Sequence, residues 1–169
     1  MNGNNCMLSK VLLSVLMKTT SFRSFLFIAA VSLLACLRTA GAEGVPWLTD
    51  YNAAIEQANK ENRNILLDFT GSDWCPVCME MEKNTFNTAE FKDFAAKNLV
   101  LLQLDFPLSK PVPDKLKAQN EHLSDVYGVG DGFPVYILID KTGKVLVRNL
   151  GGVPGGPAAF IALLEGKKT

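Results

Sequence analysis

Residues 64–78 read NILLDFTGSDWCPVC and contain the most informative fold signal of the chain. Its first six residues form an apolar run that is too continuous for a strand with one face in water, which is typical of a central parallel strand. Residues 70–74 are expected to form a loop. A helix is then expected to begin at Cys75 and run to Lys83, because Pro76 is tolerated in the first helical turn, where its missing N–H is not needed.

The flanking sequence alternates helices and strands. A second continuous apolar strand is expected at 99–105, and two strands joined through helices imply parallel pairing. The turn-rich residues 140–143 favour an antiparallel hairpin between strands at 135–139 and 144–149. The remaining expected elements are helices at 49–61, 89–97 capped by Thr88, 114–127 and 157–164. The order α-β-α-α-β-α-β-β-α predicts an α/β domain around one sheet.

Composition and charge suit one exported globular domain. The chain is 48% hydrophobic and 20% charged, and its 169 residues have room for one core. All seventeen acids follow residue 42, whereas four of the seventeen bases precede it. The remaining thirteen bases against seventeen acids give residues 43–169 a net charge of about −4. This charge excludes the basic footprint of a nucleic-acid-binding protein.

The acid-free stretch 1–42 has the form of an export signal. Bases precede an apolar run at 25–37, which is shorter than the roughly 20 residues that a membrane-spanning helix needs. Small residues then end at Ala42, so we expect cleavage after Ala42. The domain prediction is therefore a signal peptide at 1–42 and a mature domain at 43–169, in the periplasm or secreted.

Two alternatives remain for this leader. Residues 33–36, Leu-Leu-Ala-Cys, are similar to the lipobox of bacterial lipoproteins, in which case Cys36 would carry a lipid anchor. The leader is also long, and Met17 followed by Lys18 would by itself begin an ordinary signal peptide. Cleavage after Ala42 leaves two of the four cysteines, so the mature domain has no separate structural disulfide.

The remaining pair, Cys75 and Cys78, is the candidate reactive site. Two cysteines in the first turn of a helix can close a small disulfide ring, and the helix N-terminus stabilises a thiolate on the first. Cys75 is thus the expected nucleophile, and Cys78 is placed to attack a mixed disulfide on Cys75 and release the substrate. A zinc site is the weaker interpretation, because there is no second cysteine pair and the single histidine, His122, lies on a polar helix.

The motifs together resemble the thioredoxin family over roughly residues 47–166. They are the strand ending Leu-Leu-Asp-Phe, the run Trp74 to Cys78, and Gly132-Phe133-Pro134 before a hairpin. The chain is most similar to exported bacterial thioredoxin-like proteins and to the C-terminal domain of periplasmic electron-transfer proteins that reduce disulfides. The resemblance implies a thioredoxin fold, with a mixed sheet of four or five strands flanked by helices. It also implies a cis-proline at Pro134, where the neighbouring backbone, including Phe133, would pair with an incoming peptide.

Other residues around the cysteines have two interpretations each. Trp74 can be an apolar platform for substrates or a packing residue. Asp68 corresponds to the acid that, in the family, helps to deprotonate the resolving thiol, but it precedes Cys75 by seven positions, one more than in typical thioredoxins. Three further acids, Asp73, Glu80 and Glu82, are expected to form a solvated rim, which counts against a strong oxidant because nearby acids raise a thiol pKa.

These residues predict a protein-disulfide oxidoreductase, with reduction or dithiol relay favoured over strong oxidation. Such an exchange needs no cofactor. The expected partners are disulfide-bearing exported proteins and a redox partner, which can be membrane-bound, and the domain is expected to be a monomer. One alternative is a copper-binding or copper-handover module, to which Met79 and Met81 give some substance. Another is a chaperone-like protein that recognises peptides near Pro134.

Overall fold

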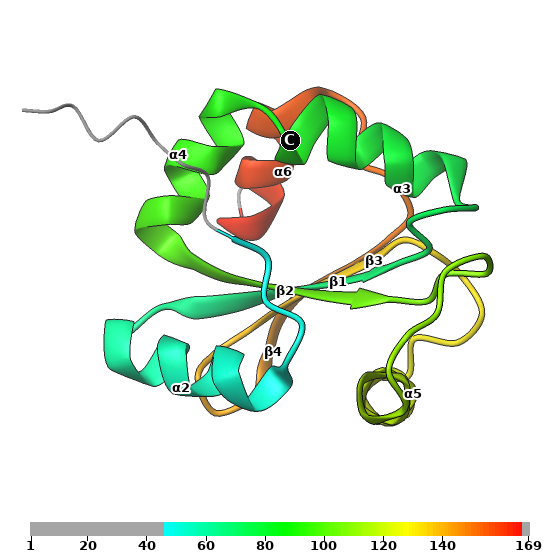
Figure 1. Cartoon of the computed structure of the whole chain (residues 1–169). Coiled ribbons are helices and arrows are strands. Elements are labelled where there is room, and N and C mark those ends of the chain that lie inside the picture. The colour runs from blue at the N-terminus through cyan, green and yellow to red at the C-terminus, as the bar shows by residue number, and fades with distance from the viewer. Residues whose placement is uncertain (1–45, 167–169) are drawn as a thin grey trace, which may run out of the picture. The chain divides into compact units, whose positions relative to one another are not determined.

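A mixed four-stranded sheet with the order β2-β1-β3-β4 organises the domain (Figure 1). The structure is a computed structural model that describes residues 46–166. The central strand β1 (Asn64–Thr70) pairs in parallel with β2 (Leu99–Asp105). On its other side β1 pairs antiparallel with β3 (Val135–Ile139), which forms a hairpin with β4 (Val145–Leu150). The expected mixed sheet, parallel pair and hairpin are therefore confirmed.

Within residues 46–166, five α-helices and one π-helix flank this sheet in two layers. Their bounds are α2 (Tyr51–Glu61), α3 (Pro76–Met81), the π-helix η1 (Glu82–Phe86), α4 (Ala89–Asn98), α5 (Asp114–Tyr127) and α6 (Gly156–Leu164). Helices α2 and α5 lie on one face of the sheet, and α3, α4 and α6 lie on the other (Figure 1). None of the helices within residues 46–166 is both long and apolar enough to cross a membrane.

The strand β1 is buried on both faces, as its continuous apolar run predicted. Ile65, Leu67 and Phe69 belong to the core beneath α2 and α5, whereas Leu66 belongs to the core beneath α4 and α6. Side chains alternate along a strand, so Asp68 points to the same face as Leu66. The chain thus places a carboxylate on the side of the sheet that α3 and η1 cover.

Phe86 is the centre of the core on that side. Its ring centroid lies 5.4 Å from that of Trp47, 5.0 Å from Phe91, 5.5 Å from Tyr136 and 5.3 Å from Phe160. These edge-on and tilted ring pairs hold η1 against β3 and α6, and each contributes about 0.5–1.5 kcal/mol beyond its buried area.

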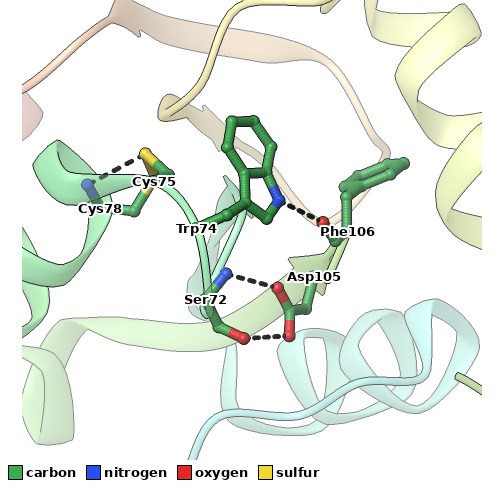
Figure 2. The surroundings of a disulfide bond; sticks show 6 residues. All are labelled: Ser72, Trp74, Cys75, Cys78, Asp105 and Phe106. Atoms are coloured by element: carbon green, nitrogen blue, oxygen red, sulfur yellow. Dashed lines mark hydrogen bonds between the residues drawn. A yellow bond between two sulfur atoms is a disulfide. The ribbon is translucent and has the colours of Figure 1, made fainter. Parts of the chain in front are cut away.

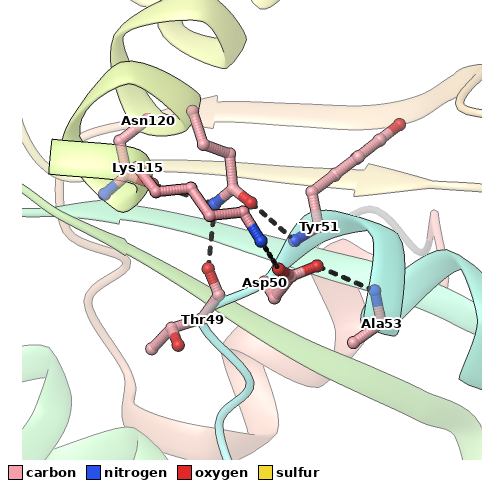
Figure 3. A network of polar contacts seen from close by, with 7 residues as sticks. Thr49, Asp50, Tyr51, Ala53, Lys115 and Asn120 are labelled. Carbon is pink, nitrogen blue, oxygen red and sulfur yellow. Dashed lines mark hydrogen bonds and ion pairs between the residues drawn. The ribbon is translucent and has the colours of Figure 1, made fainter. Parts of the chain in front are cut away.

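On the opposite face, polar contacts hold the start of α2 against α5 (Figure 3). The Gln119 side chain accepts a hydrogen bond from the Tyr51 backbone N–H at 2.9 Å and donates one to the Thr49 carbonyl at 2.8 Å. Lys115 adds an ion pair with Asp50 at 3.2 Å. Because Lys115 is largely exposed, most of the restraint comes from Gln119.

Three local features differ from the sequence expectation. Cys75 is the N-cap of α3 rather than its first helical residue, because its backbone is extended, with φ −91° and ψ 104°. The expected helix to Lys83 changes to a π-helix at Glu82. Helix α2 begins at Tyr51 rather than at residue 49, because Asp50 is its N-cap and its carboxylate accepts a hydrogen bond from the Ala53 N–H.

The predicted leader, with Cys36, Met17 and the boundary at Ala42, lies outside the described residues.

Phe86→Ala is expected to lower the free energy of unfolding by about 3–5 kcal/mol, because it removes four ring contacts and leaves a cavity. Urea denaturation measures this as a lower midpoint. Leu108→Ala is the matched control, since Leu108 is 80% exposed and should change stability by no more than about 0.5 kcal/mol. Equal midpoints for the two variants would contradict the central role of Phe86.

Candidate active site

Cys75 and Cys78 form a disulfide at the start of α3 (Figure 2). Their Cα atoms are 5.2 Å apart, and both side chains are buried, at 4% and 5% exposure. The Cys78 N–H donates a hydrogen bond to the Cys75 sulfur at 3.1 Å. A thiolate on Cys75 would keep this donor and lie at the positive end of the helix, so reduction would leave Cys75 the better nucleophile.

Trp74 is both a packed residue and an exposed one. Its Nε1–H donates to the Phe106 carbonyl at 2.8 Å (Figure 2), and its ring stands edge-on to Phe133 at 5.7 Å. Even so, 39% of the residue is exposed. Gly71 makes this position possible, because a Cβ there would lie 2.4 Å from the Trp74 ring. The indole is therefore a fixed apolar surface next to the cysteine pair.

Two aspartates hold the loop that carries the extra residue. Asp105 at the end of β2 accepts hydrogen bonds from the Ser72 N–H at 2.9 Å and the Ser72 hydroxyl at 2.6 Å (Figure 2). Asp73 accepts from the backbone N–H groups of Leu108 and Ser109 at 2.9 and 2.8 Å, and from the Ser109 hydroxyl. These bonds lower the pKa of Asp73 to about 2, and the bond from the Ser109 hydroxyl has the largest effect. Asp73 is thus more than a member of the expected rim of solvated acids, because it also joins two loops.

The Phe133–Pro134 peptide bond is cis, as the resemblance implied. Pro134 is buried and its carbonyl accepts a hydrogen bond from the Gly151 N–H at 2.8 Å. The half-buried Phe133 ring lies between Trp74 and Phe106, with centroid distances of 5.7 and 5.1 Å. The structure thus brings the predicted substrate-contacting residues Trp74, Phe133 and Pro134 together, and their contact with substrate stays a prediction.

Asp68 and Cys78 line one pocket of about 230 Å³, despite the longer spacing in the sequence. Asp68 is 3% exposed and its Oδ1 has no hydrogen-bond partner. Burial raises the pKa of this carboxyl well above its usual value, and the charges of Glu82 and Asp105 raise it further. Asp68 is thus a group that can hold a proton near Cys78.

Glu82 lies in the site, contrary to the prediction from its sequence position. It was expected on a solvated rim, yet it is half-buried, lines the pocket with Asp68, and accepts a hydrogen bond from the Asn87 side chain at 2.8 Å. The signal was its position four residues after Cys78, which puts the two side chains on one helix face. Glu80 is exposed, as expected.

Within residues 46–166, no three or more His, Cys, Asp or Glu residues are grouped so that they could hold a metal ion. His122 is exposed on α5, as expected. Met79 is 46% exposed, whereas Met81 is buried and its sulfur accepts a hydrogen bond from the Val153 N–H at 3.4 Å. Met81 therefore serves packing.

The sequence model of a family described as thioredoxin-like matches residues 46–141. The chain belongs to the thioredoxin-like family. The disulfide bond reductase DsbH of Chlamydia pneumoniae is 37% identical over 128 residues, which are 76% of this chain and 75% of that protein. A solved structure of a DsbH oxidoreductase superposes with a TM-score of 0.70 at 36% identity, over 76% of this chain and 88% of the other.

A second thioredoxin-like structure is the reduced C-terminal domain of DsbD from Neisseria meningitidis. It superposes with a TM-score of 0.52 at 28% identity, over 69% of this chain and 93% of that domain. These relatives confirm the thioredoxin fold and the resemblance to proteins of disulfide chemistry. With the disulfide between Cys75 and Cys78, they identify the chain as a thioredoxin-like oxidoreductase.

Asp68→Asn is expected to make stability less dependent on pH. The folded pKa of Asp68 is raised, so between about pH 4 and that raised value the folded protein binds a proton that the unfolded chain has lost. The free energy of unfolding therefore falls as pH rises, by about 1.4 kcal/mol per pH unit in this window. In urea denaturation at a series of pH values, the free energy of unfolding of Asp68→Asn should rise relative to that of the wild type above about pH 4. The exposed Asp131→Asn is the control, and a constant difference between Asp68→Asn and wild type would contradict the burial argument.

Gly71→Ala is expected to displace Trp74, because the new Cβ would collide with the indole ring. The tryptophan emission should shift and stability should fall by about 1–3 kcal/mol. Gly132→Ala is the control, since its Cβ would meet only Leu150 at 3.4 Å. Unchanged emission in Gly71→Ala would show that Trp74 does not rest on Gly71.

Proposed function

We propose that this thioredoxin-like oxidoreductase acts on disulfides of exported proteins, as a reductase or dithiol relay. The observation that carries the proposal is the pair Cys75 and Cys78, joined at the start of α3 with the buried Asp68 lining the pocket beside Cys78. The relative DsbH is named a disulfide bond reductase, which supports the same direction.

The proposed exchange moves two electrons from the reduced pair to the substrate. The Cys75 thiolate attacks a substrate disulfide, forms a mixed disulfide and releases one substrate thiolate. Cys78 then loses its proton to the Asp68 carboxylate and attacks the Cys75 sulfur, which releases the second substrate thiolate. The released thiolates take up protons, and the enzyme is left with the disulfide between Cys75 and Cys78. No cofactor takes part in these steps.

Trp74, Phe133 and Pro134 are the proposed substrate-contacting residues. The edge-on Trp74 and Phe133 rings offer an apolar surface beside Cys75, and the backbone near Pro134 would pair with an extended peptide segment. The exposed Val77, at 41%, extends the apolar surface on the helix side of the cysteines. Main-chain pairing tolerates many sequences, so this surface suits a range of unfolded or loop-borne disulfides.

The charges near the pair support reduction over strong oxidation. A strong oxidant of this fold stabilises its thiolate form, and the reduction potentials of thioredoxin-fold proteins range from about −270 mV to about −120 mV. Here Asp68 and Glu82 line the pocket with Cys78. Negative charge on these acids would disfavour a thiolate on the cysteine pair. A potential toward the reducing end follows from these two acids.

The proposed place of action is outside the cytoplasm. The predicted signal peptide 1–42 would export the domain 43–169 to the periplasm or beyond, with lipid anchoring at Cys36 as the alternative. A reductant in that compartment has to be re-reduced, so the proposal includes a dithiol donor, which can be membrane-bound. The proposed working form is a monomer.

Cys75→Ala is expected to abolish reduction of a protein disulfide, whereas Cys78→Ala should accumulate mixed disulfides because nothing resolves them. Non-reducing electrophoresis and mass spectrometry of the purified protein with an oxidised substrate measure both results. Adducts on Cys75→Ala but not on Cys78→Ala would reverse the assigned roles.

The reduction potential decides the direction. Equilibration with glutathione mixtures should give a value nearer to about −270 mV than to about −120 mV. A value near the oxidising end would make the protein a disulfide donor. Failure to cycle, together with tight copper binding by the reduced protein, would replace the oxidoreductase proposal with the copper alternative.

A further inference from the structure

Asp68 and Tyr136 form a cross-strand pair with two unsatisfied polar atoms. The two residues are directly opposed in the antiparallel pairing of β1 with β3. Asp68 Oδ1 and the Tyr136 hydroxyl are also the two buried side-chain polar atoms within residues 46–166 that have no hydrogen-bond partner. Opposed side chains on one sheet face have Cβ atoms about 4.5–5.5 Å apart, and the charge of Asp68 acts on the Tyr136 hydroxyl, so the two side chains share one buried environment.

Packing does not explain the hydroxyl of Tyr136. The residue is 2% exposed, and its ring lies edge-on to Phe86 and Phe160 at 5.5 and 5.0 Å. A phenylalanine would make the same ring contacts without burying a polar group. A buried hydroxyl is costly unless it finds a partner, which points to a role in a state where Asp68 is charged.

The other groups around Asp68 include further negative charges. Glu82 on η1 and Asp105 on β2 add negative charge, and Lys83 and Gln103 line the same pocket together with Cys78 on α3. Burial, then the charges of Asp68 and Glu82, raise the pKa of Tyr136, so its hydroxyl keeps its proton and remains a donor. Tyr136 is thus a neutral donor on the β3 side of the carboxylate.

We propose that Tyr136 is a positioning residue that directs its hydroxyl hydrogen bond to the Asp68 carboxylate and so favours the form of Asp68 that accepts the Cys78 proton. This inference rests on the proposed function, because it assigns Tyr136 to the step in which Cys78 resolves the mixed disulfide. The donor offsets the burial of the charge without adding a charge of its own.

The test compares Tyr136→Phe with Tyr127→Phe, each alone and with Asp68→Asn. Tyr127→Phe is the matched control, because the Tyr127 hydroxyl lies 3.3 Å from that of Tyr51 on the opposite side of the sheet. One readout is the pH dependence of Cys78 attack on a mixed disulfide at Cys75. The second is the ¹³C shift of the Asp68 carboxyl during a pH titration, which does not depend on turnover.

Tyr136→Phe should move both midpoints upward by about one pH unit, so that resolution is about tenfold slower below the midpoint. Tyr127→Phe should leave both in place, and Asp68→Asn should remove the effect of Tyr136→Phe on resolution. An unchanged carboxyl midpoint in a folded Tyr136→Phe variant, or an equal effect in the Asp68→Asn background, would overturn the proposal. If wild-type protein does not reduce disulfides, the proposed function fails, and the carboxyl titration alone still decides whether Tyr136 acts on Asp68.

Discussion

The buried carboxylate of Asp68 imposes the main constraint on this domain. A strand buried on both faces, β1, carries an acid on the face that α3 and η1 cover, and that acid has no partner for one oxygen. An ionised carboxylate is poorly solvated there, so the group is poised to hold a proton beside Cys78. The same burial that destabilises the fold at higher pH keeps a proton-binding group beside Cys78, and in the proposed mechanism this group accepts the Cys78 proton.

Positions around the cysteines are held by contacts that are distant in sequence. Asp105 fixes Ser72, Asp73 fixes the loop at 108–109, and the Phe106 carbonyl holds the Trp74 indole. The end of β2 and the loop after it therefore decide where the cysteine loop sits. These hydrogen bonds hold the loop in one conformation. Cys78 therefore lines the same pocket as Asp68, although the loop is one residue longer than in typical thioredoxins.

Much of the architecture was predictable from the chain, because it depends on local patterns. The continuous apolar run at 64–69 predicted a central strand, and Thr88 predicted the start of α4, where its side chain caps the helix. The placement of Cys75 at a helix start followed from Pro76, whose ring suits the first turn. The hairpin turn at 140–143 was predictable because these residues are of types that favour turns.

Local patterns in the chain therefore predict the order of elements, the sheet with its parallel and antiparallel pairs, and a reactive cysteine pair at a helix start. Only the folded chain shows that Asp73 anchors a loop, that Glu82 lines the pocket, and that Asp68 lies opposite Tyr136 in the sheet. The spacing of apolar residues and the capping of helices depend on residues that are close in the sequence. Strand register and the partners of a buried charge depend on segments that meet only when the chain has folded.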